Sequence, residues 1–217
     1  MKALLGLLAL AAGLAQAADM SVVRYIDQDP GDPPYATRIL VTADFMRMDS
    51  GEDDGDFILL DRRKQTVINV MRGNQLALVF TPGELPARPA GWKPRLDVQS
   101  GAPGTQRFSL VVNGMACSEG VAARVAAPDV ARAMAELKAV LAATQYRVWQ
   151  ATPPELQHDC DLANQVWESG ITLKLGLPLE EREFSGRTRQ FEYHSSQPDR
   201  PELFRVPEGM PTVAAAS

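Results

Sequence analysis

The residue types best suited to covalent chemistry stand together at His158-Asp159-Cys160. A thiol next to an imidazole could act as a catalytic nucleophile, because the base activates the thiol. Residues two apart on a helix, however, point about 200° away from each other, so the side chains of His158 and Cys160 would not touch. We therefore predict that this tripeptide is not a catalytic site.

Two groups of residues have the chemistry to bind a metal ion. The acidic stretch 49–56 supplies carboxylates, the ligands that calcium prefers, but its glycines are out of register with the EF-hand pattern. We interpret it as a solvated hairpin loop. Met46 and Met48, with Met71 and Met115, could offer thioethers to Cu(I). Methionine on the buried face of a sheet usually fills a core, so we predict no metal site and no cofactor.

Sequence motifs and charge argue against several other functions. The chain contains no G-x-S-x-G, H-E-x-x-H, P-loop or G-x-G-x-x-G motif, and neither His158 nor His194 has a second ligand at metal spacing. A net charge of −5 with a pI near 5.1 does not favour a nucleic acid as partner. The 45% hydrophobic content over 217 residues suits one globular domain. We predict a protein that is not an enzyme.

The first segment has the pattern of an export signal. Lys2 is followed by an uncharged run from Ala3 to Leu14, and Ala15-Gln16-Ala17 places small residues where a signal peptidase reads. We predict a signal peptide over residues 1–17 and delivery to a bacterial periplasm. No later stretch approaches the roughly 20 apolar residues of a membrane-spanning helix, so we expect no transmembrane segment.

The two cysteines fit an exported protein, because disulfides persist in oxidising compartments. Cys117 and Cys160 can form one bond, and two buried free thiols are the alternative. Cys117 lies at the start of an expected strand and Cys160 on the core-facing side of an expected helix. A disulfide between them would hold the helix against the sheet.

Short segments rich in β-branched and aliphatic residues alternate with polar turns through most of the chain, which predicts an antiparallel meander. Prolines and glycines interrupt it between residues 81 and 104, where we expect irregular structure. The expected strands are residues 22–26, 37–42, 45–49, 56–60, 66–71, 75–80, 106–112, 117–125, 171–175, 181–184 and 188–193.

Two helices are expected between residues 127 and 167. The first opens at Pro128-Asp129, with proline early and a carboxylate near the positive end of the helix dipole. The second opens at Thr152, with capping-box spacing to Glu155. Each carries apolar residues at intervals of four, three and four, which are Val130, Met134, Leu137 and Leu141 in the first and Leu156, Cys160, Ala163 and Trp167 in the second.

Three stretches combine these patterns: the run FMRMDSG followed by DFILLDRRKQTVINVM, then ITLKLGLPLEEREFSG, and finally PELFRVPEG. They resemble the superfamily of the periplasmic lipoprotein carrier and the outer-membrane lipoprotein receptor, and more closely the uncharacterised bacterial periplasmic proteins with that fold. The resemblance implies an α+β fold, in which a strongly curved antiparallel sheet forms a half-barrel covered by two helices. We expect this domain at residues 18–210 and a flexible tail at 211–217.

The resemblance also implies a function. A half-barrel of this kind would hold an apolar ligand on its concave face, such as an acyl chain or a lipoprotein tail. We expect the ligand to contact Met46, Met48, Leu137, Leu141 and Trp167. The alternative is an envelope accessory protein, which would have a filled core and would bind another envelope protein instead of a lipid.

Overall fold

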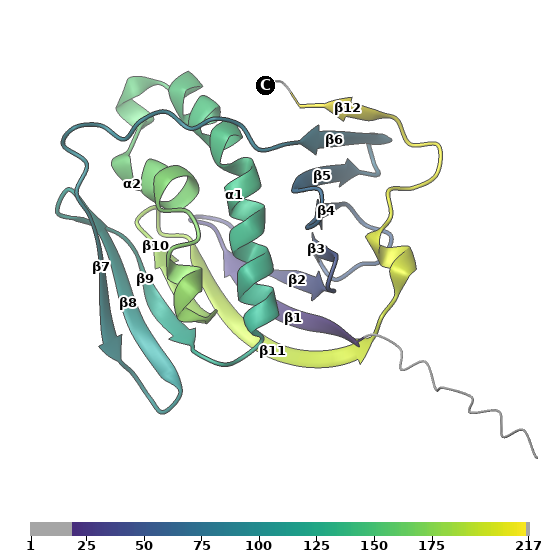
Figure 1. The fold of residues 1–217 in the computed structure, drawn as a ribbon, viewed down its shortest axis with the longest axis horizontal. Coiled ribbons are helices and arrows are strands. Elements are labelled where there is room, and N and C mark those ends of the chain that lie inside the picture. The colour runs from purple at the N-terminus through teal and green to yellow at the C-terminus, as the bar shows by residue number, and fades with distance from the viewer. Residues whose placement is uncertain (1–18, 216–217) are drawn as a thin grey trace, which may run out of the picture.

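A computed structural model of the chain describes residues 19–215 and contains one 12-stranded sheet (Figure 1). The expected signal peptide at residues 1–17 lies outside the described residues. The strand order is β12-β6-β5-β4-β3-β2-β1-β11-β10-β9-β8-β7, and all neighbours are antiparallel except β12 and β6. The strands are β1 Asp19–Gln28, β2 Tyr35–Val41, β3 Phe45–Asp49, β4 Phe57–Asp61, β5 Thr66–Met71, β6 Leu76–Phe80, β7 Pro94–Ser100, β8 Thr105–Val112, β9 Met115–Ala123, β10 Leu177–Glu183, β11 Thr188–Pro198 and β12 Thr212–Ala214.

The meander expected in the first half of the chain is confirmed. Strands β1 to β6 pair in sequence order, and β3 and β5 have the predicted bounds. The second half adds β7 to β11 on the other side of β1, where β11 pairs with β1 along its length. The N-terminal strand β1 and the late strand β11 therefore lie side by side in the middle of the sheet.

Helix α1, Pro128–Ala151, lies across one face of this sheet (Figure 1). Val130, Met134 and Leu137 of its expected stripe are buried there against residues of β1 to β5, and Leu141 is partly buried. The helix begins as expected, with Pro128 in its first turn and Asp129 accepting a hydrogen bond of 2.8 Å from the Ser21 hydroxyl. It ends before Pro153-Pro154, because proline cannot continue a helix. None of the helices within residues 19–215 is both long and apolar enough to cross a membrane.

A second apolar cluster fills the opposite face of β1 to β6. There Leu203 and Phe204, in the short helix η4 Pro201–Phe204, cover residues such as Leu40 and Leu59. Strand β3 is consequently buried on both faces, and Met46 and Arg47 are each 1% exposed.

The expected second helix is much shorter than the sequence pattern predicts. It consists of the four-residue helix α2 Asp159–Leu162, followed by one π-helical turn, Ala163–Trp167. Pro153 and Pro154 confine the preceding turn to a short 3-10 helix, η1 Pro154–Leu156. The strand expected at 171–175 is also wrong, because Thr172–Leu175 forms the 3-10 helix η3. Cys160 and Ala163 of the expected stripe are buried, but Leu156 is exposed, so the apolar spacing fixed neither the whole buried face nor the hydrogen-bonding pattern.

The predicted fold class is therefore wrong. The described chain is predominantly β, and α1 is the only α-helix in it longer than four residues. The sheet is open and not strongly curled, so the expected half-barrel under two helices is not what forms. Its two outer strands, β12 and β7, each pair with a single neighbour. Both are unsuited to closing a barrel, since β12 has three residues and most of β7 is solvent-exposed.

Two strands lie where the sequence indicated none. Strand β7 falls within the proline-rich segment 81–104, and its first residue is Pro94, a position that proline tolerates on an edge strand. Strand β12 falls within the expected tail 211–217 and pairs with β6 in parallel. Backbone pairing to a sheet edge demands little of the side chains, which is why the composition of these segments did not predict it.

The expected disulfide is confirmed. Cys117 on β9 is bonded to Cys160 on α2, with the two Cα atoms 4.8 Å apart. Both residues are fully buried in a third cluster with Leu110 and Val112 of β8. The bond holds α2 against the sheet, as the positions of the two cysteines predicted.

Candidate ligand-binding site

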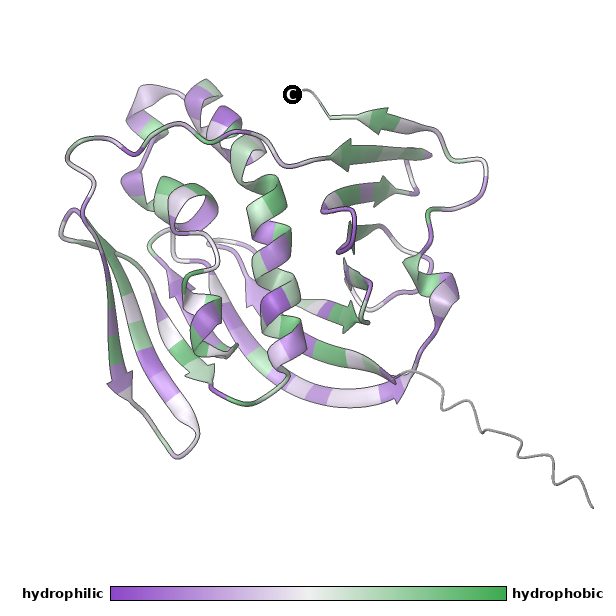
Figure 2. Cartoon of the chain, viewed as in Figure 1, coloured by the Kyte–Doolittle hydropathy of each residue, from purple (hydrophilic) through white to green (hydrophobic). Residues whose placement is uncertain are grey.

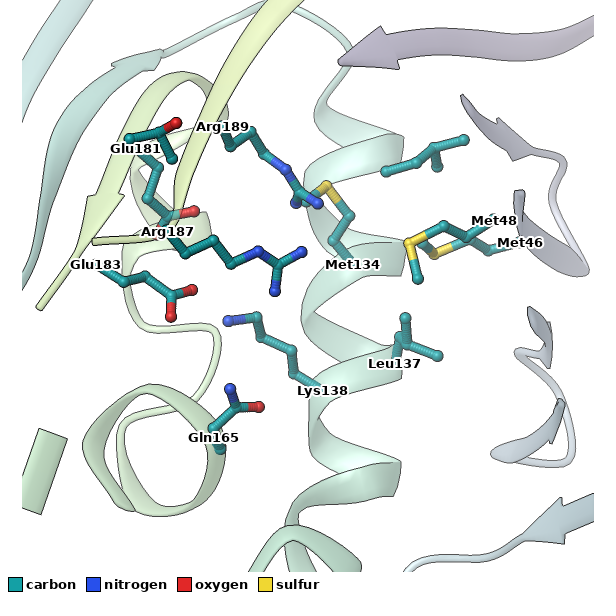
Figure 3. A pocket seen from close by; sticks show the side chains of 12 residues that line it. Met46, Met48, Met134, Leu137, Lys138, Gln165, Glu181, Glu183, Arg187 and Arg189 are labelled. Carbon is teal, nitrogen blue, oxygen red and sulfur yellow. The ribbon is translucent and has the colours of Figure 1, made fainter. Parts of the chain in front are cut away.

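A cavity of about 140 Å³ lies between α1 and the sheet (Figure 3). One of its walls is apolar and the opposite wall is charged. The lining residues are Ile39, Met46, Met48, Met134, Leu137, Lys138, Gln165, Glu181, Glu183, Arg187, Thr188 and Arg189.

The apolar wall follows from two periodicities. Met46 and Met48 are two apart on β3, so both point to the face that α1 covers. Met134 and Leu137 are three apart on α1 and therefore lie on one side of the helix. Thioether side chains are flexible and polarizable, so this wall can adapt its shape to an apolar group.

The charged wall comes from β10, β11 and the turn between them. Figure 2 shows β11 as largely hydrophilic, in contrast to the hydrophobic β6. Glu181 and Glu183 alternate on β10, Arg187 precedes β11, and Arg189 follows on it. The Glu183 N–H donates to the Arg187 carbonyl at 2.9 Å, which closes the turn. Lys138 of α1 joins this wall from the helix side, and Figure 3 shows it directed toward Glu183 and Arg187.

Arg189 is fixed by a buried carboxylate. Its Nε and Nη2 donate to the two oxygens of Asp27, each at 2.8 Å, and Asp27 is fully buried. The Thr37 hydroxyl donates to the same carboxylate at 2.8 Å. Burial by itself raises the pKa of Asp27, but the hydrogen bonds from Arg189 and Thr37 outweigh it, and the pKa is lowered. The guanidinium also lies 4.8 Å from the Tyr25 ring centre, so Arg189 is a rigid part of the wall.

The pKa of Glu183 is raised, in contrast to that of Asp27. Burial is the largest influence on this carboxyl and raises its pKa above the ordinary value of 4.5, although Lys138, Arg187 and Arg189 act to lower it. The described structure shows no hydrogen bond or ion pair to its side chain that would compensate. The cavity therefore contains a carboxylate that is costly to ionise.

Glu183→Gln is expected to raise the midpoint of thermal unfolding by a few degrees at neutral pH. A carboxyl whose pKa is higher in the folded than in the unfolded chain binds more protons when folded, so stability falls as pH rises above about 4.5. The difference in unfolding midpoint between the variant and the unmodified chain should therefore increase as the pH rises above about 4.5 and disappear below that pH. Thermal unfolding from pH 4 to pH 8 measures this, with the exposed Glu84→Gln as control. An equal gain at all pH values would contradict it.

The structure brings together only part of the predicted binding set. Met46, Met48 and Leu137 line the cavity. Leu141 packs against the core one helical turn further along α1. Trp167 lies elsewhere, in an aromatic cluster under the proline-rich segment.

The aromatic cluster is a structural contact between that segment and the helices. The Trp167 ring centre is 4.7 Å from that of Trp92, and its Nε1 donates to the Pro86 carbonyl at 3.1 Å. Trp92 Nε1 donates to Glu168 Oε1, also at 3.1 Å. Through these contacts Trp92 and Trp167 hold the proline-rich segment against the π-helical turn that contains Trp167.

The sequence patterns did not indicate that Met134 or any residue of the charged wall would line a binding site. The available signal was the alternation of charges in Glu181-Arg182-Glu183 and Arg187-Thr188-Arg189 across an expected hairpin. Alternation of this kind places like residues on one face, but only packing decides whether that face meets solvent or α1.

The acidic stretch 49–56 is mostly exposed, as expected of a hairpin loop, and Asp49 is its one buried residue. Asp49 binds the guanidinium groups of Arg47 and Arg38, at 2.6 and 2.8 Å, and Asp53 binds Arg38 at 2.8 Å. Within residues 19–215 no group of three or more His, Cys, Asp or Glu side chains is arranged to hold a metal ion. Met71 and Met115 do not line the cavity that contains Met46 and Met48.

Comparison with known proteins gives little further information. No protein-family model and no curated protein match the sequence. Similar solved structures include two of PNGF-II, in different space groups. The first has a TM-score of 0.38 and 12% identity over 91% of this chain and 32% of that one. The second has a TM-score of 0.35 and 10% identity over 91% and 31%. The chain spans less than a third of theirs, and similarity at this level supports no functional conclusion.

Proposed function

We propose that this chain is an exported, non-catalytic binding protein of the bacterial periplasm that takes an apolar group into the cavity between α1 and the sheet. The observation that carries the proposal is the cavity itself, which has a continuous wall formed by Met46, Met48 and Leu137. Ligand sites are typically concave and mostly apolar, with a few polar groups that orient the ligand. The export pattern at residues 1–17 and the buried disulfide support the periplasmic location.

The size of the cavity limits the ligand. A dry cavity of about 150 Å³ accepts a molecule the size of benzene. The space of about 140 Å³ therefore suits a ring or part of an acyl chain, and not a whole lipoprotein tail. The remainder of a larger ligand would lie outside the cavity.

A second function is favoured by the packing of α1. Val130, Met134, Leu137 and Val140 already fill most of the face that a lipid would occupy. On this basis the chain would be an accessory protein that binds another envelope protein through its surface. In that case apolar probes would not bind saturably, which separates the two functions.

Binding of a neutral apolar dye, N-phenyl-1-naphthylamine, tests the cavity, because the phenyl ring of the dye has the size of benzene and its naphthyl group can remain outside. We expect saturable binding with one site per chain, and at least about tenfold weaker binding by Met48→Trp, because the larger side chain occupies the apolar space. Val148→Trp on the exposed side of α1 is the control, since Val148 is 57% exposed. Thermal unfolding would verify that both variants fold.

Two results would overturn the proposal. The absence of saturable binding to the unmodified chain would favour the accessory function. Equal affinity of Met48→Trp and the unmodified chain would show that the dye binds at another place.

A further inference from the structure

Two cations of the described structure line the cavity and hold no carboxylate at hydrogen-bond distance. The guanidinium of Arg187 comes no nearer than 3.7 Å to Asp27 and 3.6 Å to Asp29. The same Asp27 is held at 2.8 Å by both Arg189 and Thr37, so its oxygens are already occupied. Arg187 therefore retains most of its capacity to donate hydrogen bonds.

Lys138 is the second cation. Its Nζ donates to the Asn164 carbonyl at 3.3 Å, and the described residues place no carboxylate within 4.0 Å of it. An ammonium group has three donors, so two of them remain for a ligand. Lys138 and Arg187 come from different elements, and Figure 3 shows their charged ends directed toward one another across the cavity.

Glu183 is the nearest candidate for balancing these charges, but it forms no ion pair with either cation in the described structure. Burial raises its pKa, so its negative charge is lost at a higher pH than that of an exposed glutamate. Glu181 also lines the cavity and lies opposite Arg189 in the β10–β11 pair. Arg189 is committed to Asp27, so Lys138 and Arg187 remain as the pair of cations able to accept a new anion.

We propose that the cavity binds an amphipathic acid, with its anionic group between Lys138 and Arg187 and its apolar part against Met46, Met48 and Leu137. The inference rests on the proposed function and adds the chemical class of the ligand. Two donors converging from α1 and from the β10–β11 turn can hold a carboxylate or a phosphate monoester through charge-assisted hydrogen bonds. The opposite apolar wall distinguishes such a ligand from a small inorganic anion.

Matched ligands test the head group. Decanoate, decyl phosphate and decanol share a ten-carbon chain, and their affinities can be measured by displacement of the neutral dye. We expect at least one of the two anions to bind about tenfold or more tightly than decanol, since a hydrogen bond to a charged group contributes that much. The tighter anion identifies the head group. Inorganic phosphate and acetate should bind far more weakly than either.

A double variant tests the two cations. Lys138→Gln/Arg187→Gln is expected to lose the preference for anions while keeping its affinity for decanol. The control is Arg63→Gln/Lys64→Gln, which removes the same charge from the β4–β5 turn, where the side chains are 77% and 78% exposed. This control should keep the full preference.

Equal affinity for the anions and decanol would overturn the inference but leave the proposed function standing. A preference that survives in the cavity variant, or disappears in the control, would also overturn it, because the attraction would then be a general charge effect. Failure of all three long-chain ligands and of the dye to bind would overturn the proposed function as well.

Discussion

Arg47→Met is expected to lower the free energy of unfolding by about 3–5 kcal/mol, the usual cost of breaking a buried ion pair from one side. Arg47 is 1% exposed and lies on the face of β3 opposite the cavity. Its Nε donates to Asp49 at 2.6 Å and its Nη1 donates to the Leu203 carbonyl at 2.9 Å. Its Nη2 reaches the carbonyls of Glu52 and Asp53, at 3.2 and 3.0 Å.

This one side chain therefore joins three parts of the chain: strand β3, the acidic loop and helix η4. The guanidinium also stacks over Phe57, 4.0 Å from the ring centre. Methionine would fill much of the same volume but would leave three carbonyls without their donor, and Asp49 would keep only Arg38 and the Gly51 N–H as partners. We expect the loss of stability to be largest in the segment around Leu203, which should open more readily than in the unmodified chain.

Urea unfolding measures the effect. The control is Arg63→Met, at a side chain that is 77% exposed, which should change stability by no more than about 0.5 kcal/mol. Hydrogen exchange at Leu203 and Phe204 would report the release of η4. A loss below about 1 kcal/mol for Arg47→Met would contradict the assignment of Arg47 as the link between these segments.

Removal of the disulfide is expected to cost about 4 kcal/mol. The bond between Cys117 and Cys160 closes a loop with a sequence separation of 43, and the chain-entropy model gives this value for a loop of that length. Cys117→Ala/Cys160→Ala removes both sulfur atoms without leaving a reactive thiol. Urea unfolding of the variant and of the oxidised chain gives the difference.

The reduced, unmodified chain is the matched control, because it keeps both side chains and lacks only the bond. Its stability should be close to that of the double variant. If the oxidised and reduced chains unfold at the same urea concentration, the bond does not stabilise the fold. Dye binding by the double variant should persist under conditions where the variant is folded, since neither cysteine lines the cavity.

Half of the candidate site could be predicted from sequence and half could not. Met46, Met48 and Leu137 were placed correctly on the covered face, because period-two and helical spacing assign side chains to faces from local sequence alone. Lys138, Glu183 and Arg187 were missed, since charged residues at these positions would normally be read as solvent-facing. Their role depends on α1 and the β10–β11 turn meeting, although these elements are far apart in the chain.

Elements that arise from local signals could be read from the amino-acid sequence. Alternation and turn residues specified strands such as β3 and β5, proline and apolar spacing specified α1, and the presence of only two cysteines specified the disulfide. Other features arise only in the folded chain: Arg47 is buried under η4, β7 and β12 extend an open sheet, and the cavity has one apolar and one charged wall. These features depend on which faces meet after the chain has folded, and local periodicity carries no information about that.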